Sequence, residues 1–95
     1  MEFREAVQEI IESVPSGVIF DSHFVINQLI KRYSDEYINF TSTFAKTENS
    51  TLPAHGNIGQ LIAEFEGQLV AQQANESWSE NIHGNASPCA LWQRI

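Results

Sequence analysis

Positive charge is scarce in this chain: 5 Lys and Arg stand against 12 Asp and Glu among 95 residues, which gives a formal net charge of −7. Both halves of the chain are acidic, so the average conceals no basic segment. Sequence-independent binding to nucleic acid comes mainly from neutralisation of phosphates by Lys and Arg, so the composition disfavours nucleic acid as a partner. An anionic membrane surface is disfavoured for the same reason.

Cysteine and long apolar runs are scarce as well. Cys89 is the single cysteine, which excludes an intramolecular disulfide and fits a reducing compartment. No apolar run approaches the roughly 18 residues that a membrane span needs. The first residues, with Glu2 and Glu5 around Arg4, lack the basic and apolar regions of a signal peptide. We therefore expect a cytoplasmic protein with no membrane partner.

The residues that are present have the composition of a globular domain. Of the 95 residues, 42% are hydrophobic and 18% are charged, which is too apolar for a disordered tail. A typical domain has about 100–150 residues, so this length allows one domain with one core. We expect a single domain over residues 1–95.

The N-terminal part of the chain predicts a helix followed by a short strand. Apolar residues at helical spacing form one stripe: Phe3, Val7, Ile10, Ile11 and Val14. Pro15 should end this helix near Ser13. Residues 18–20 are three strand-forming residues between Gly17 and Asp21, and they predict a short strand.

Residues 22–45 carry a further helical pattern. Either Asp21 or Ser22 is a good N-cap for the helix that begins there. The sequence leaves open whether the segment is one bent helix or two helices. We favour two helices, with the break near Ser34.

The rest of the chain predicts a loop, a helix and a hairpin. Residues 46–54 are polar and turn-forming and predict a loop. Apolar residues between positions 56 and 66 predict a short helix, which Gly67 ends. Residues 69–73 and 89–95 are strand-like, and a polar, turn-rich stretch separates them. An antiparallel hairpin is the simplest interpretation.

This order of elements resembles the winged helix-turn-helix fold. The resemblance makes residues 18–20 the small first strand and puts residues 56–66 in the place of the recognition helix. Residues 69–73 and 89–95 are then the wing strands, and residues 81–87 lie in the wing loop. It implies an α+β fold, a small domain with three or four helices packed on a C-terminal β-hairpin and a short extra strand. The chain departs from the pattern because ~10 residues, instead of 3–4, separate its third and fourth helical stretches.

The recognition-helix position offers little to DNA. Winged-helix DNA binders resemble one another in presenting Arg, Lys, Asn or Gln there, with further bases for phosphates. Here Glu64 and Glu66 oppose any phosphate, and Arg94 is the only base near the wing. The candidate interaction surface combines this helix with the polar loop: His55, Asn57, Gln60, Trp78, Asn81, His83, Asn85 and Arg94.

Two tryptophans, Trp78 and Trp92, flank the polar loop and allow two interpretations. Their side chains can pack the hairpin onto the helices, as large aromatic residues usually do. Alternatively the loop is a contact surface, because aromatic residues and adaptable polar residues are common at protein interfaces.

Three histidines and the cysteine raise the question of a metal site. His23, His55, His83 and Cys89 show neither CxxC nor HxxxH spacing, and no two of the histidines lie within one helical turn. We therefore expect no metal and no cofactor.

Catalysis is not expected either. Asp21, Ser22 and His23 are the residue types of a catalytic triad, but adjacent side chains diverge at the start of a helix. Capping accounts for the first two of them. A nucleophile at Cys89 with His83 as its base lacks electropositive surroundings that lower the thiol pKa.

The sequence thus predicts a non-enzymatic module that mediates protein–protein interaction. The net charge favours a basic partner, and a homo-oligomer stays open. The alternative is a DNA-binding, transcription-regulatory winged helix that acts in a dimer or larger complex through four residues: His55, Asn57, Gln60 and Arg94. A third class is a small enzyme that uses Cys89 and His83.

Overall fold

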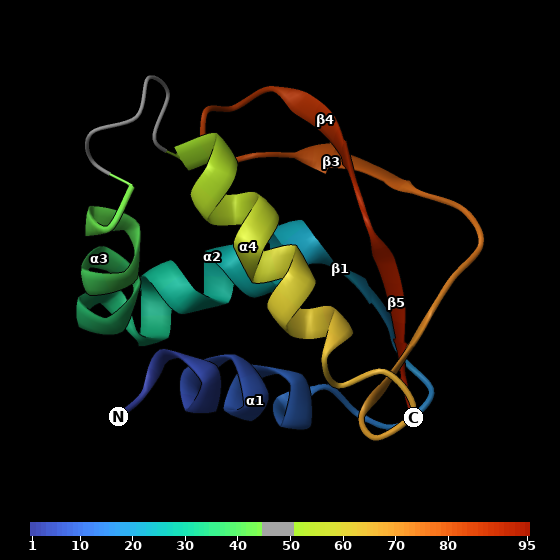
Figure 1. Ribbon diagram of the computed structural model, residues 1–95. Coiled ribbons are helices and arrows are strands. Elements are labelled where there is room, and N and C mark those ends of the chain that lie inside the picture. The colour runs from blue at the N-terminus through green and yellow to red at the C-terminus, as the bar shows by residue number, and fades with distance from the viewer. Residues whose placement is uncertain (45–50) are drawn as a thin grey trace.

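The first helix forms where the apolar stripe predicts it. In the computed structural model, which describes residues 1–44 and 51–95, α1 spans Phe3–Ser13 (Figure 1). The stripe packs into or against the hydrophobic core. Val14 leaves the helix with ψ at 126°, as expected for a residue that precedes Pro15. Gly17, with φ at 86°, turns the chain toward β1 (Ile19–Asp21).

The segment after β1 forms two helices, which confirms the favoured interpretation. α2 spans Ser22–Arg32 and α3 spans Ser34–Ser42. Tyr33 separates them with φ at −136° and ψ at 51°, outside the helical region. Asp21 is the N-cap of α2, since its carboxylate accepts a hydrogen bond from the N–H of Phe24 at 2.8 Å.

The fourth helix begins earlier than the sequence predicts. α4 spans Thr51–Ala63, so the loop prediction is wrong for residues 51–54, while residues 46–50 of that prediction lie outside the described residues. The helix also ends three residues before its predicted end. Gly67 adopts φ 81° in the turn that follows, not at the helix cap, and its N–H donates to the carbonyl of Val70 at 2.9 Å.

The last strand of the chain is the centre of a three-stranded antiparallel sheet. β2 spans Val70–Gln72 and β5 spans Leu91–Arg94, and the strand order is β1-β5-β2. Trp92 of β5 stands opposite Phe20 of β1 on one side and Gln72 of β2 on the other. The two predicted wing strands therefore pair with each other, over a shorter length than the sequence predicts.

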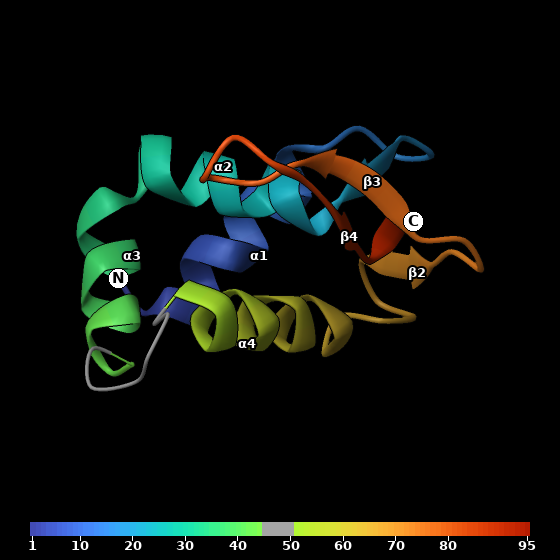
Figure 2. The same cartoon turned by 90° about the horizontal axis from the view of Figure 1, so that it is seen from above.

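A second sheet lies between β2 and β5 in the chain, and the sequence does not predict it. β3 (Ser77–Glu80) pairs antiparallel with β4 (Ala86–Cys89). The predicted loop at residues 81–87 is therefore correct only up to residue 85. Figure 2 shows this hairpin over α2, where hydrogen bonds from its serines reach Asp21 and His23.

One hydrophobic core joins the helices to the three-stranded sheet. Its buried members are Ala6, Val7, Ile10, Ile11, Val14, Phe20, Val25, Ile26, Leu29, Ile58, Ile62, Phe65, Val70 and Trp92. The indole N–H of Trp92 donates to the buried hydroxyl of Ser22 at 3.0 Å, which ties β5 to the start of α2. The chain is thus an α+β domain, with four helices and two small antiparallel sheets among the described residues. Within the same residues, every helix is too short or too polar to cross a lipid bilayer.

Candidate functional site

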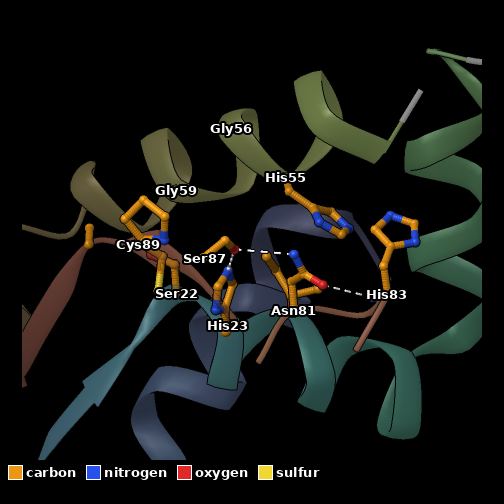
Figure 3. A pocket seen from close by; sticks show the side chains of 12 residues that line it. Ser22, His23, His55, Gly56, Gly59, Asn81, His83, Ser87 and Cys89 are labelled. Atoms are coloured by element: carbon orange, nitrogen blue, oxygen red, sulfur yellow. Dashed lines mark hydrogen bonds between the residues drawn. The ribbon is translucent and has the colours of Figure 1, made fainter. Parts of the chain in front are cut away.

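A cavity of about 490 Å³ opens where α2, α4 and the β3–β4 hairpin meet (Figure 3). Polar side chains from all three elements line it: His23, His55, Asn81, His83, Ser87 and Cys89. Gly56 and Gly59 of α4 form part of the wall, and a Cβ atom on Gly56 would meet nothing within 4 Å. The small residues of α4 therefore leave room beside the polar groups.

The fold brings together the three histidines and the cysteine that the sequence leaves unconnected. His23 lies in the first turn of α2 and His55 in the second turn of α4. His83 belongs to the turn between β3 and β4, and Cys89 ends β4. Packing of the hairpin on α2 and α4 thus places four groups with lone pairs around one cavity.

The hydroxyl of Ser79 lies near two polar side chains beside the cavity. It is 2.7 Å from Nδ1 of His23 and 4.0 Å from Sγ of Cys89. The hydroxyl of Ser77 donates to Oδ2 of Asp21 at 2.8 Å. Asp21, one of the two predicted N-caps, therefore caps α2 and at the same time holds the hairpin against that helix.

Burial and hydrogen bonds set the charges of this cluster. Burial raises the pKa of the Cys89 thiol, and the negative charge of Asp21 raises it further. Although burial also raises the pKa of Asp21, hydrogen bonds from the N–H of Phe24 and from Ser77 and Ser79 hold it below 3.8. At neutral pH the cluster thus holds a carboxylate and a protonated thiol, which argues against an activated cysteine nucleophile.

His55 lines another part of the cavity and is hydrogen-bonded to Tyr37 of α3. The hydroxyl of Tyr37 is 2.8 Å from Nε2 of His55. Burial lowers the pKa of His55, and charge on His23 and His83 lowers it further. The imidazole of His55 is therefore neutral at neutral pH and can accept a hydrogen bond from the tyrosine.

Asn81 has a structural task that the sequence interpretation does not assign to it. Its Oδ1 accepts hydrogen bonds from the N–H groups of His83 at 2.9 Å and Asn85 at 3.2 Å, and its Nδ2 donates to Ser87 at 3.2 Å. Gly84, with φ at 81°, completes the turn. Asn81 thus shapes the loop between β3 and β4, in the manner of an Asx turn.

The two tryptophans have opposite surroundings. Trp92 is 2% exposed and packs in the core, as the packing interpretation predicts. Trp78 is 71% exposed on β3, so that interpretation is wrong for it. Trp78 stands opposite Pro88 of β4 on the outer side of the hairpin.

The predicted interaction residues do not all share one face. Asn57 and Gln60 are exposed on α4 near the cavity, whereas His55 is half-buried in its wall. Arg94 lies at the far end of β5, where its guanidinium donates to the carbonyl of Ile95 at 2.6 Å. Arg94 is therefore separated from the hairpin loop and from the start of α4.

Positive charge beside α4 is already matched. Arg4 of α1 lies 2.8 Å from the carboxylate of Glu64, and its guanidinium stacks 4.5 Å from the ring centroid of Phe65. Arg4 lies beside the C-terminal end of α4. Because it is already paired with Glu64, it is not an unpaired cation that could bind a phosphate there.

The sequence interpretation missed Ser77, Ser79 and Tyr37. The alternation Ser77-Trp78-Ser79-Glu80 is the one signal that indicates a strand with a polar face, and it is short.

Comparison with known protein families, curated proteins and solved structures finds no match to this chain. Its function must therefore be argued from the geometry of its surface and its cavity.

Proposed function

We propose that this chain is a non-enzymatic interaction module that binds a basic segment of another protein through the outer face of the β3–β4 hairpin. The observation that carries the proposal is Trp78, which exposes 71% of its surface on a strand. Large aromatic side chains bury much of their area in folded proteins, and exposed ones are enriched at interfaces.

The neighbours of Trp78 indicate the chemistry of the partner. Successive residues of a strand point to opposite faces, so Glu80, two residues after Trp78 on β3, shares its face, and Glu76 lies directly before the strand. Both glutamates are exposed. A Lys or Arg side chain placed over the indole meets the negative face of its ring, and the flanking carboxylates add ion pairs.

Long-range charge favours the same partner. The net charge of −7 attracts a basic chain and repels an acidic one during encounter. The single thiol fits the cytoplasm, where we propose that the module acts.

A winged-helix-like interpretation of the fold supports the same proposal. β2 and β5 then serve as wing strands, α4 stands in the place of the recognition helix, and the β3–β4 hairpin extends the wing. Because Glu64, the first residue after α4, pairs with Arg4, the C-terminal end of that helix offers little to phosphates. We therefore infer that the extended wing, not the helix, is the binding element.

Isothermal titration with a short peptide of alternating Arg and Gly tests the proposal. Trp78→Ala should weaken binding about tenfold, which corresponds to the loss of one cation–π contact. Ile38→Ala is the matched control, because Ile38 is 60% exposed on α3, and it should leave binding unchanged.

Three results contradict the proposal. The first is no binding of the arginine peptide at low salt, and the second is an equal loss in the Ile38→Ala variant. The third is tight binding of duplex DNA at physiological salt that Trp78→Ala does not affect, which would favour the DNA-binding alternative. Sedimentation of the free chain distinguishes self-association from capture of a different partner.

A further inference from the structure

We propose that Asp21, His23 and Cys89 form a binding site for a divalent transition-metal ion, with zinc as the preferred ion. One ligand atom from each residue lies within 4.8 Å of the other two. Asp21 ends β1, His23 lies in the first turn of α2, and Cys89 ends β4. The site therefore exists only in the folded chain, because three separate elements supply its ligands.

The donor set determines the class of ion. A carboxylate oxygen, an imidazole nitrogen and a thiolate sulfur together suit zinc or cobalt, whereas calcium and magnesium prefer oxygen ligands alone. Ligand atoms around a tetrahedral zinc ion are roughly 3.4–3.8 Å apart, given bond lengths of about 2.0–2.3 Å. The three donors need to approach one another by about 1 Å, which side-chain rotation can supply.

Serine hydroxyls surround the three donors and hold them in place. Ser77 donates to one oxygen of Asp21 at 2.8 Å. Nδ1 of His23 lies 2.7 Å from Ser79 and Nε2 lies 3.4 Å from Ser87, so Ser87 can orient the ring while Nδ1 binds an ion. Hydrogen bonds of this kind, which orient the metal ligands, are typical of metal sites in proteins.

Ser79 marks where the ion would lie. Its hydroxyl is 2.7 Å from Nδ1 of His23 and 4.0 Å from the sulfur of Cys89, so two of the three donors lie around one polar atom. A metal ion replaces that hydroxyl as their common partner, and rotation about χ1 takes the hydroxyl aside.

Charge balance is favourable for a doubly charged cation. As a ligand, Asp21 contributes one negative charge as a carboxylate. On binding, the S–H bond of Cys89 breaks, its proton passes to solvent, and a metal–sulfur bond forms. One carboxylate and one thiolate then neutralise the two positive charges of the ion.

Three protein ligands leave a fourth coordination position. Cys89 and His23 line the 490 Å³ cavity, with His55 and His83 elsewhere in its wall. The fourth position can therefore face the cavity, as in zinc sites that accept an exogenous ligand rather than in closed structural sites.

Titration of the metal-free chain with Co²⁺ tests the site. We expect one ion per chain and a thiolate-to-cobalt charge-transfer band in the near ultraviolet. Partners that only orient a ligand contribute about 10–100-fold in affinity, so loss of a ligand in Cys89→Ala or His23→Gln should cost more than about 100-fold. Asp21→Asn is a third variant that folds readily, because Asn is also a good N-cap.

His83→Gln is the matched control, since His83 lines the same cavity but is not one of the three donors. The His83→Gln variant should keep the charge-transfer band. We also expect Zn²⁺ to raise the melting temperature of the parent chain, and to raise that of this variant equally. Absence of the band in the parent chain overturns the proposal, and so does cobalt binding that survives Cys89→Ala. Far-ultraviolet circular dichroism of each variant verifies that its fold is retained.

The metal-site proposal and the peptide-binding proposal can be tested independently. Trp78→Ala should bind Co²⁺ like the parent chain, because Trp78 lies on the outer side of the hairpin. Loss of peptide binding without loss of cobalt binding therefore concerns the hairpin face alone.

Discussion

The hydrogen bond between Ser22 and Trp92 gives the sharpest stability prediction. Ser22→Ala removes the acceptor of the indole N–H, which is 3.0 Å from it in the core. A buried donor left without a partner costs about 1–3 kcal/mol, out of a total of roughly 5–14 kcal/mol for a domain of this length. The melting temperature should fall by roughly 4–8 °C for each kcal/mol.

Urea denaturation followed by far-ultraviolet circular dichroism measures this loss without relying on tryptophan fluorescence. In the Ser22→Ala, Trp92→Phe double variant, the unpaired N–H is gone, so its cost should be smaller than the sum of the single variants by about 1 kcal/mol. Ser34→Ala is the control: its hydroxyl is exposed and donates to the carbonyl of Ile30, so we expect a change within about 0.5 kcal/mol. Additive costs, or a Ser22→Ala cost no larger than the control, would refute the reasoning.

Three further predictions concern single positions. Burial, with charge on His23 and His83, lowers the pKa of His55 in the folded chain. As the pH falls, His55 is therefore protonated in the unfolded chain before it is protonated in the folded chain. Stability should therefore fall as the pH drops below about 6.5, the ordinary value, and His55→Gln should reduce that fall in urea titrations. Gly67→Ala should destabilise the fold by about 1–2 kcal/mol, because φ is 81° there. The added Cβ meets no atom within 4 Å, so this cost comes from the backbone conformation and not from a steric clash. Gly56→Ala, in a helix with equal space, should instead stabilise by about 0.5–1 kcal/mol, and equal effects at both glycines would contradict this account.

Local signals explain which helices the sequence predicts. Pro15 ends α1 and Asp21 caps α2 through short-range contacts that a few neighbouring residues determine. The start of α4 was not predicted because Pro53 and the polar residues 46–51 before it are typical of loops. Pro is nevertheless tolerated in the first turn of a helix, where its missing N–H has no intrahelical partner.

The second hairpin and the cavity could not be predicted for different reasons. Pro88 argues against a strand, yet in a two-stranded sheet every strand is an edge, where proline is allowed. The meeting of His23, His55 and Cys89 depends on the docking of that hairpin, a long-range event with no local signature. Polar residue types were visible in the sequence, whereas their proximity was not.

The position of β5 has a consequence for synthesis on the ribosome. β1 and β2 do not pair with each other, and each needs β5 between them. Neither β1 nor β2 can form its hydrogen bonds with β5 until residues 91–94 have left the exit tunnel. Until then, the helices that fold earlier lack the sheet, and Phe20 and Val70 stay exposed to solvent. A nascent chain arrested before this point should attract chaperones that a chain released after it no longer needs.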